Sequence, residues 1–303
     1  MAADIVVDPV SPAEWAGLAP FIAAFNAASG DVRCLHSHAG DDVAAHADEL
    51  RSLSPDAACY CVARRGRRVV GVAGAEYDLQ LGRAWLRGPL VAPGENFNSV
   101  GGPLLDALIA RLPPTLARHD AFVSADCAEA LDFYRARRFA ADAGHDEFTL
   151  SVPMAARALP RGVQIEPPDA AWRDAIALLH EAEFPGAYVI ADALFLPPAP
   201  DRFTRIALVD GIAAGYVHAH YDAQWREGYV DFLAVASTAR RRGVGRALLQ
   251  AAVDWSFEQR GARAVTLTVR ADRAEARALY LAAGFVRVRT GIGMQWRTDG
   301  SSG

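Results

Sequence analysis

The chain contains an internal repeat, and this repeat constrains its fold more than any other feature of the sequence. The stretch VGVAGAEYD at residues 70–78 recurs as AGYVHAHYD at residues 214–222. Further along, VSADCAEALDFYRARRF at residues 123–139 aligns with VRADRAEARALYLAAGF at residues 269–285. Matches of this extent between the two halves indicate a duplicated domain.

The best candidate for the boundary between the two copies is the segment SVPMAARALPRG at residues 151–162. It carries two prolines and a glycine and lacks a regular apolar period, as connecting segments do. The sequence therefore predicts an N-terminal domain over residues 1–152 and a C-terminal domain over residues 163–303. Each domain has an ordinary size for an independent core.

The second half shows strand-like and helical patterns in a definite order. Strand-like runs are separated by turn residues, whereas apolar residues three and four apart indicate amphipathic helices. This order predicts a mixed α/β fold, with a mixed β-sheet flanked by helices in each of two tandem domains. The expected elements are strands at 163–168, 202–211, 212–222, 227–236 and 264–270 and helices at 169–184, within 239–255 and at 274–284.

The overall composition excludes several functional classes. The formal net charge of −5 argues against general nucleic-acid binding, which requires a basic surface. No apolar run approaches the roughly 18 residues of a membrane span, and the N-terminal stretch does not resemble a signal peptide, so we expect a cytoplasmic protein without membrane contact. Cysteines and histidines lack metal-ligand spacing, so we expect buried thiols and no metal, and we interpret His36 and His38 as polar loop residues.

The stretch ARRRGVGRALLQAAVDW at residues 239–255 places arginines and glycines directly before a helix. Helix N-termini carry unpaired N–H groups and a partial positive charge, so arginines there favour a bound anion such as a phosphate. A Walker loop needs a lysine, which the chain lacks, and the dinucleotide fingerprint needs glycine in place of Leu248. A phosphate loop and a simple glycine-bearing turn both remain open for this short stretch.

The order of motifs around this loop resembles the GNAT acetyltransferase superfamily. YVDFLAV resembles its fourth strand, ARRRGVGRALL its pyrophosphate loop, and LTVRADRAEARALYLAAGF its following strand and helix. The resemblance covers the second half and, through the repeat, extends more faintly over the first. The chain is thus similar to tandem GNAT proteins, an arrangement shared with mycothiol synthases. The resemblance implies an acetyl-CoA-dependent N-acetyltransferase whose C-terminal domain acts on a primary amine of a small molecule or peptide.

The resemblance also implies where acetyl-CoA would bind. Backbone groups of Leu233, Ala234 and Val235 would pair with the pantetheine arm as with an added strand. Where the family commonly has an asparagine, this chain has Arg273, which could reach a phosphate or remain a solvated surface residue. The loop expected to hold the pyrophosphate comprises Arg240, Arg241, Arg242, Gly243, Val244, Gly245 and Arg246.

Two residues are implied to move protons. Tyr280 stands at the family's tyrosine position and would protonate the leaving sulfur, although a tyrosine packing its helix onto the sheet is the alternative. Asp231 stands where many relatives carry a glutamate and would accept the proton of the amine, although a structural ion pair is equally consistent with its position. The Val235 N–H would polarise the thioester carbonyl.

Four further residues are candidates for acceptor binding. His218 and His220 share one face of an expected strand, and a histidine can titrate near neutral pH. Glu181 and Glu183 lie where relatives build the mouth of the acceptor site, and their charge would favour a cationic amine. The alternatives are cross-strand packing for the histidines and ordinary surface charge for the glutamates.

The first half lacks most of these features. Asn96 and Ser99 replace the leading arginine and the first glycine of the loop, and Arg87 replaces the acidic strand residue. Pro103, expected in the first turn of the helix, would remove a further N–H donor, while Tyr134 is retained. The first domain is therefore predicted to keep the fold without the cofactor chemistry, so that the chain acts as a monomer with two domains arranged like a dimer. A non-catalytic acyl-CoA sensor is the alternative function.

Overall fold

The computed structural model describes residues 4–29, 40–187 and 189–297, and its contacts divide the chain into two compact units. The first unit comprises Met1–His145 together with Arg289–Gly303, and the second comprises Asp146–Val288. Cys34, His36 and His38 lie outside the described residues.

The first unit is built on a mixed β-sheet with the strand order β1-β2-β3-β4-β5-β13. Neighbouring strands are antiparallel except β4 and β5, which are parallel. The strands are β1 (Ile5–Val10), β2 (Ala58–Arg65), β3 (Arg68–Asp78), β4 (Arg83–Val91), β5 (Arg118–Ser124), the short β6 (Ala140–Ala141) and the end of β13 (Val286–Arg297).

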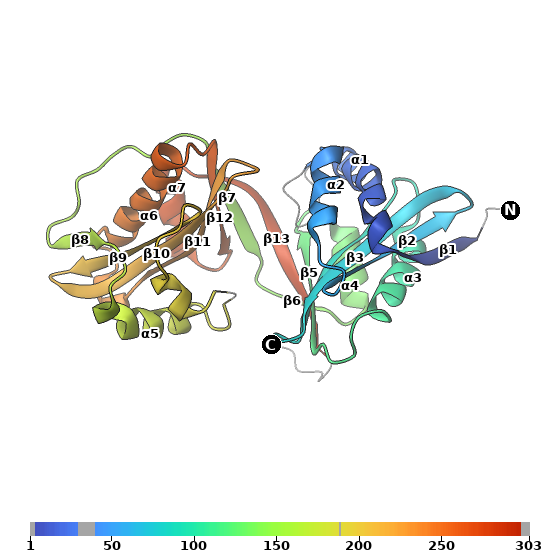
Figure 1. Ribbon diagram of the computed structural model, residues 1–303, viewed down its shortest axis with the longest axis horizontal. Helices are drawn as coiled ribbons and strands as arrows, with labels where there is room; N and C mark the ends of the chain where they lie inside the picture. Colours follow the sequence, from blue (N-terminus) through green and yellow to red (C-terminus); the bar gives the residue numbers. More distant parts are fainter. Residues whose placement is uncertain (1–3, 30–39, 188, 298–303) are drawn as a thin grey trace. The chain divides into compact units, whose positions relative to one another are not determined.

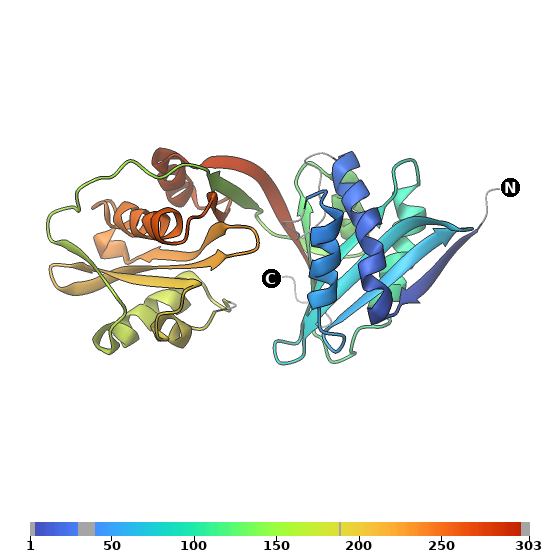
Figure 2. The same cartoon turned by 45° about the horizontal axis from the view of Figure 1, so that its top comes forward.

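Helices cover both faces of this sheet (Figure 2). Helices α1 (Ala19–Ser29) and α2 (Val43–Ser52) lie on one face, and α3 (Phe97–Ile109) and α4 (Ala128–Ala136) lie on the other. The core between these layers consists of aliphatic and aromatic side chains, so burial of the apolar sheet faces accounts for the layered arrangement.

The second unit repeats this plan with the strand order β8-β9-β10-β11-β12-β7. The fourth and fifth strands of this sheet, β11 and β12, are again parallel. The strands are β7 (His145–Leu150), β8 (Val163–Glu166), β9 (Arg202–Val209), β10 (Ile212–Asp222), β11 (Glu227–Val235) and β12 (Ala264–Arg270).

Two separate apolar cores lie on the two faces of this second sheet. Helix α5 (Arg173–Glu183) packs on one face, where Tyr216 and Phe232 are buried. Helices α6 (Val244–Asp254) and α7 (Ala274–Ala283) pack on the other face (Figure 1). The sequence prediction of a mixed α/β fold with a helix-flanked mixed sheet is confirmed.

The last strand of each repeat lies in the sheet of the other unit. Apart from its first residue, β7 belongs to the second unit, although it ends the first half of the sequence. Conversely, residues Gly291–Arg297 of β13 pair antiparallel with β5 of the first unit. The boundary proposed at 151–162 does not anticipate this exchange, because a strand's alternating pattern does not specify which sheet edge it joins.

One local expectation for the first unit is wrong. Helix α3 begins at Phe97, so Pro103 is its seventh residue and does not lie in the first turn. The helix starts early because the side chain of Asn96 caps it, accepting a hydrogen bond from the Ser99 N–H at 2.9 Å.

Candidate active site of the second unit

The parallel strands β11 and β12 separate partway along their length. Their register runs from Glu227 opposite Ala264 to Val230 opposite Leu267, and β11 then continues to Val235 paired with β10. Parallel strands stay together only while their backbone groups bond each other. The edge of β11 beyond Val230 that faces away from β10 is therefore open to a ligand.

A β-bulge marks the point of separation. His218 of β10 pairs with Phe232 and Ala219 pairs with Val230, so Asp231 is the extra residue on β11. Bulges bend a strand and redirect its side chains, and they recur beside active sites. The bulge places Asp231 at the start of the open edge.

Backbone groups of two residues face this open edge. Ala236 donates its N–H to the Ala214 carbonyl at 2.8 Å, and backbone groups alternate in direction along a strand. Leu233 and Val235 therefore present their backbone groups to the open side. Those of Ala234 face β10, so the expectation that Ala234 would offer backbone groups to a ligand is wrong.

The loop between β11 and α6 leaves the N-terminus of that helix without a side-chain cap. Gly243 occupies the N-cap position with a φ of 79°, and Arg241 also has a positive φ of 60°. Left-handed conformations favour glycine, and a Cβ at Gly243 would lie 2.8 Å from Pro160. Gly245 lies close to Val235 and Leu279, which a larger side chain would crowd. The first N–H groups of α6 thus remain directed at the end of the open edge.

The arginines of the loop differ in what they contact. Arg240 donates from Nε to the Val235 carbonyl at 3.1 Å and from Nη2 to Glu183 at 2.5 Å. Arg242 pairs with Asp210 at 3.3 Å, away from the open edge. Arg246 donates to the Ala282 carbonyl at the end of α7.

Arg273 lies on the other side of the separation, at the N-cap of α7, and its Nη1 is 3.7 Å from Glu183. The structure therefore brings Glu183 between Arg240 and Arg273, two of the arginines expected to bind phosphate. Sequence reasoning missed this cluster because Glu183 and Arg240 are 57 residues apart and no local pattern links them.

Tyr280 of α7 is buried, as the packing alternative would require, with its ring against Phe148 and Phe285. Within the described residues its hydroxyl has no hydrogen-bond partner. Burial, with a smaller contribution from the nearby Tyr229, raises the pKa of Tyr280 to about 12. The phenol is therefore held in its protonated form and can act as a proton donor.

Asp231 and His220 form a dyad. His220 Nδ1 lies 2.8 Å from Asp231 Oδ2, the carboxylate is 4% exposed and the imidazole is 49% exposed. A carboxylate accepts hydrogen bonds, so Nδ1 carries the proton and Nε2 is left as the free basic atom of the neutral ring. The hydrogen bond that His220 donates to Asp231, together with the charges of Asp231, Asp222 and Asp201, raises the pKa of His220 against the opposing effect of burial.

The other predicted histidine has a structural environment. His218 is buried and hydrogen-bonded to Thr204 at 2.8 Å, and burial lowers its pKa. Sequence reasoning missed another buried histidine of this unit, His180 of α5. His180 donates from Nε2 to the Val189 carbonyl at 2.8 Å and accepts from the Tyr216 hydroxyl at 2.5 Å. Glu181, in the last turn of the same helix, is exposed.

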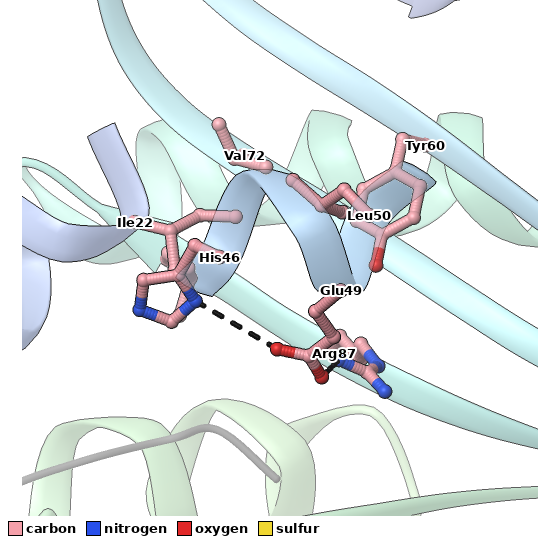
Figure 3. A pocket seen from close by; sticks show the side chains of 8 residues that line it. Ile22, His46, Glu49, Leu50, Tyr60, Val72 and Arg87 are labelled. Carbon is pink, nitrogen blue, oxygen red and sulfur yellow. Dashed lines mark hydrogen bonds and ion pairs between the residues drawn. The ribbon is translucent and has the colours of Figure 1, made fainter. Parts of the chain in front are cut away.

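In the first unit, the positions that correspond to this site are occupied by internal contacts. Asn96 caps α3, and the Tyr134 hydroxyl donates to the Gly88 carbonyl. Arg87, at the position of Asp231, pairs with Glu49 at 2.7 Å and also with Glu76. Figure 3 shows Arg87 and Glu49 at the rim of a small cavity beneath α2. Asn96, Tyr134 and Arg87 therefore each have a partner from the protein here.

Two features are absent from the described part of the chain. None of its helices is long and apolar enough to cross a membrane. Over the same residues, no group of three or more histidine, cysteine or acidic side chains is arranged to hold a metal ion.

Comparisons with known proteins agree with this geometry. Residues 170–285, which contain the open edge, the loop and Tyr280, match the family model of the acetyltransferase (GNAT) family. No curated protein matches the chain.

Solved structures extend the similarity over the whole chain. A GCN5-related N-acetyltransferase from Sphaerobacter thermophilus is 18% identical with a TM-score of 0.70, and the alignment covers 97% of this chain and 95% of that one. A tandem GNAT protein from the clavulanic acid biosynthesis pathway, solved without AcCoA, is 18% identical with a TM-score of 0.65 and coverage of 99% and 100%. A putative-acetyltransferase structure from Pyrococcus horikoshii is 13% identical with a TM-score of 0.53 and coverage of 97% and 89%.

At these identities the solved structures show the fold, and the family model matches the unit that carries the open site. Residues 170–285 of the second unit are therefore similar in sequence to the GNAT acetyltransferase family, and the whole chain shares the fold of the GNAT-type solved structures.

Proposed function

We propose that the second unit is an acetyl-CoA-dependent N-acetyltransferase that transfers the acetyl group directly to a primary amine. The observation that carries this proposal is the continuity of the open edge of β11 with the uncapped N-terminus of α6. The first provides backbone groups for an extended amide-containing chain, and the second provides N–H groups for a phosphate. Acetyl-CoA contains both parts, joined in this order.

The residues present fit that cofactor. Leu233 and Val235 would bond the pantetheine arm, and the Val235 N–H would polarise the thioester carbonyl. The N–H groups of the loop from Arg240 to Arg246 would hold the pyrophosphate, with the guanidinium groups of Arg240 and Arg273 as charged partners. When bound, acetyl-CoA supplies an acyl group activated as a thioester.

We assign the acceptance of the amine proton to His220, with Asp231 as its positioning residue. Asp231 is less suited than His220 to take the proton directly, because its carboxylate is almost fully buried and is hydrogen-bonded to the imidazole. Nε2 of neutral His220 takes the proton from the attacking amine, while Asp231 holds the ring and stabilises its charged form. Asp222 and Asp201 add negative charge around His220, which favours a cationic acceptor.

Tyr280 completes the proton balance. Its hydroxyl would donate its proton to the sulfur of the departing coenzyme A, and bulk water would then reprotonate the phenolate. The transfer therefore forms an amide bond and breaks the thioester bond, without an enzyme-bound acyl group. We further propose that the first unit carries no cofactor and that the chain acts as a monomer.

The test is a screen of primary amines with acetyl-CoA, in which thiol release and the mass of the acceptor are followed together. The panel includes polyamines, amino acids, aminoglycosides and peptide N-termini. Thiol release coupled to the mass gain of one acetyl group supports the proposal. Tight cofactor binding without transfer to any amine class, and with no change when Tyr280 is replaced by phenylalanine, would favour the acyl-CoA sensor instead.

A further inference from the structure

Glu183 forms ion pairs with arginines on both sides of the separation between β11 and β12. The residue ends α5, and its two carboxylate oxygens face different arginines: Oε1 is 2.5 Å from Arg240 Nη2, and Oε2 is 3.7 Å from Arg273 Nη1. Arg240 follows β11, whereas Arg273 follows β12. The carboxylate therefore bridges elements that the diverging strands hold apart.

This bridge also covers part of the open edge. Arg240 Nε donates a hydrogen bond to the Val235 carbonyl. This carbonyl faces away from β10, towards the open edge. One arginine thus connects Glu183 to the backbone that an extended ligand would need. The ion pairs of Glu183 therefore occupy the same arginines that are proposed to hold the cofactor phosphate.

We propose that Glu183 is an internal competitor of the cofactor phosphate, and that its carboxylate must leave Arg240 and Arg273 before the pyrophosphate can bind them. This inference rests on the proposed function. Guanidinium groups bind carboxylate and phosphate oxygens in the same geometry, so one anion replaces the other without rearranging the arginines. The pyrophosphate brings more charge and the helix N–H groups, which makes the exchange favourable.

The exchange connects the cofactor side of the unit to the acceptor side. Residues next to Glu183 in the chain belong to the acceptor face: Phe184 packs on Phe232 of β11, and His180 bonds Tyr216 of β10. Release of Glu183 therefore frees the end of α5 beside the predicted acceptor mouth. The carboxylate becomes available to a cationic amine only after the cofactor has bound, so the cofactor should strengthen acceptor binding.

The direct test compares coenzyme A affinity in Glu183→Gln and in the wild-type protein by calorimetry, without any acceptor. Removal of the competing charge should lower the dissociation constant about fivefold to tenfold, because Glu183 makes two partly exposed ion pairs and the pyrophosphate has to displace both. Glu275→Gln is the matched control, because Glu275 is an exposed carboxylate in the first turn of α7, close in sequence to Arg273. It should change the affinity by less than about twofold, since long-range charge effects are screened.

An unchanged or higher dissociation constant in Glu183→Gln would overturn the proposal, because Glu183 would then be inert or would position the arginines for the phosphate. Inorganic pyrophosphate serves as a second probe that does not depend on the proposed function. If coenzyme A binds neither protein but pyrophosphate binds Glu183→Gln more tightly, the competition stands and the assigned cofactor is wrong. If neither ligand distinguishes the two proteins, the competition itself is refuted.

Discussion

The two units share an order of strands and helices, and they differ in whether their polar groups are already satisfied. In the first unit, Asn96 caps the helix, Tyr134 bonds a backbone carbonyl and Arg87 pairs with two glutamates. In the second unit, the helix that begins after Gly243 is uncapped and the Tyr280 hydroxyl has no partner among the described residues. The comparison shows that the fold alone does not make a site. A site also requires groups left available for a ligand.

This difference explains how one copy of a duplicated domain can retain stability without retaining chemistry. Asn96, Tyr134 and Arg87 of the first unit have internal partners, which avoids the cost of leaving such groups unpaired. Substitutions at matched positions of the two units should therefore have opposite consequences: loss of ligand binding or rate in the second unit, and loss of stability in the first.

The largest effect is expected from a carboxylate placed in the phosphate loop. Gly243→Glu should weaken acetyl-CoA binding at least about 100-fold, because like charges in contact cost several kcal/mol. Ser99→Glu, at the matching position of the first unit, should leave binding unchanged. Calorimetry measures both. Gly243→Ala imposes similar backbone strain without the charge, and an equal loss there would assign the effect to strain.

The next largest effect concerns the matched tyrosines. Tyr280→Phe should lower the turnover number about 100-fold to 1000-fold with little change in cofactor affinity, because it removes only the transferable proton. Tyr134→Phe should instead reduce the free energy of unfolding by about 1–3 kcal/mol, since the buried Gly88 carbonyl loses its donor. Steady-state kinetics and urea unfolding separate the two results. Equal turnover in Tyr280→Phe would remove the tyrosine from the reaction.

A smaller change in rate, with a distinct pH signature, is expected for Asp231→Asn. His220 acts as a base only when neutral, so kcat/KM should rise with pH through the pKa of His220, which the aspartate raises. Without the carboxylate that pKa falls, and the rise should move to lower pH while the plateau drops about tenfold to 100-fold. A pH profile of kcat/KM provides the measurement. A rise that stays at the same pH would contradict the dyad.

The smallest effect on the cofactor site is expected from Arg87→Leu in the first unit. The variant leaves Glu49 and Glu76 without their shared cation, so it should destabilise the first unit by about 2 kcal/mol, less than for a fully buried pair because both carboxylates are partly exposed. Acetyl-CoA affinity should remain within about twofold of the wild-type value. A large loss of affinity would show that the first unit supports the cofactor site.

The sequence was sufficient for the parts of the molecule that local patterns encode. Apolar spacing located α5, α6 and α7 to within a few residues, and the glycines of the loop located the uncapped helix start. The repeat correctly paired Tyr134 with Tyr280, which occupy matching helices in the two units. These features depend on a few consecutive residues.

Features that depend on tertiary contacts could not be predicted from the sequence. Glu183 was expected at the acceptor mouth, and only the folded chain brings it to Arg240 and Arg273. His220 was expected to bind substrate, and its link to Asp231 arises from the register of β10 against β11 and from the bulge. The exchange of β7 and β13 likewise follows from sheet edges that no local pattern describes.

The central claim is that the chain has one cofactor site and that the second unit contains it. The most direct measurement is a calorimetric titration with acetyl-CoA that counts sites per chain in the wild-type protein, in Gly243→Glu and in Ser99→Glu. The account predicts one site, absent in Gly243→Glu and intact in Ser99→Glu. Two sites per chain, or a single site lost in Ser99→Glu, would contradict it.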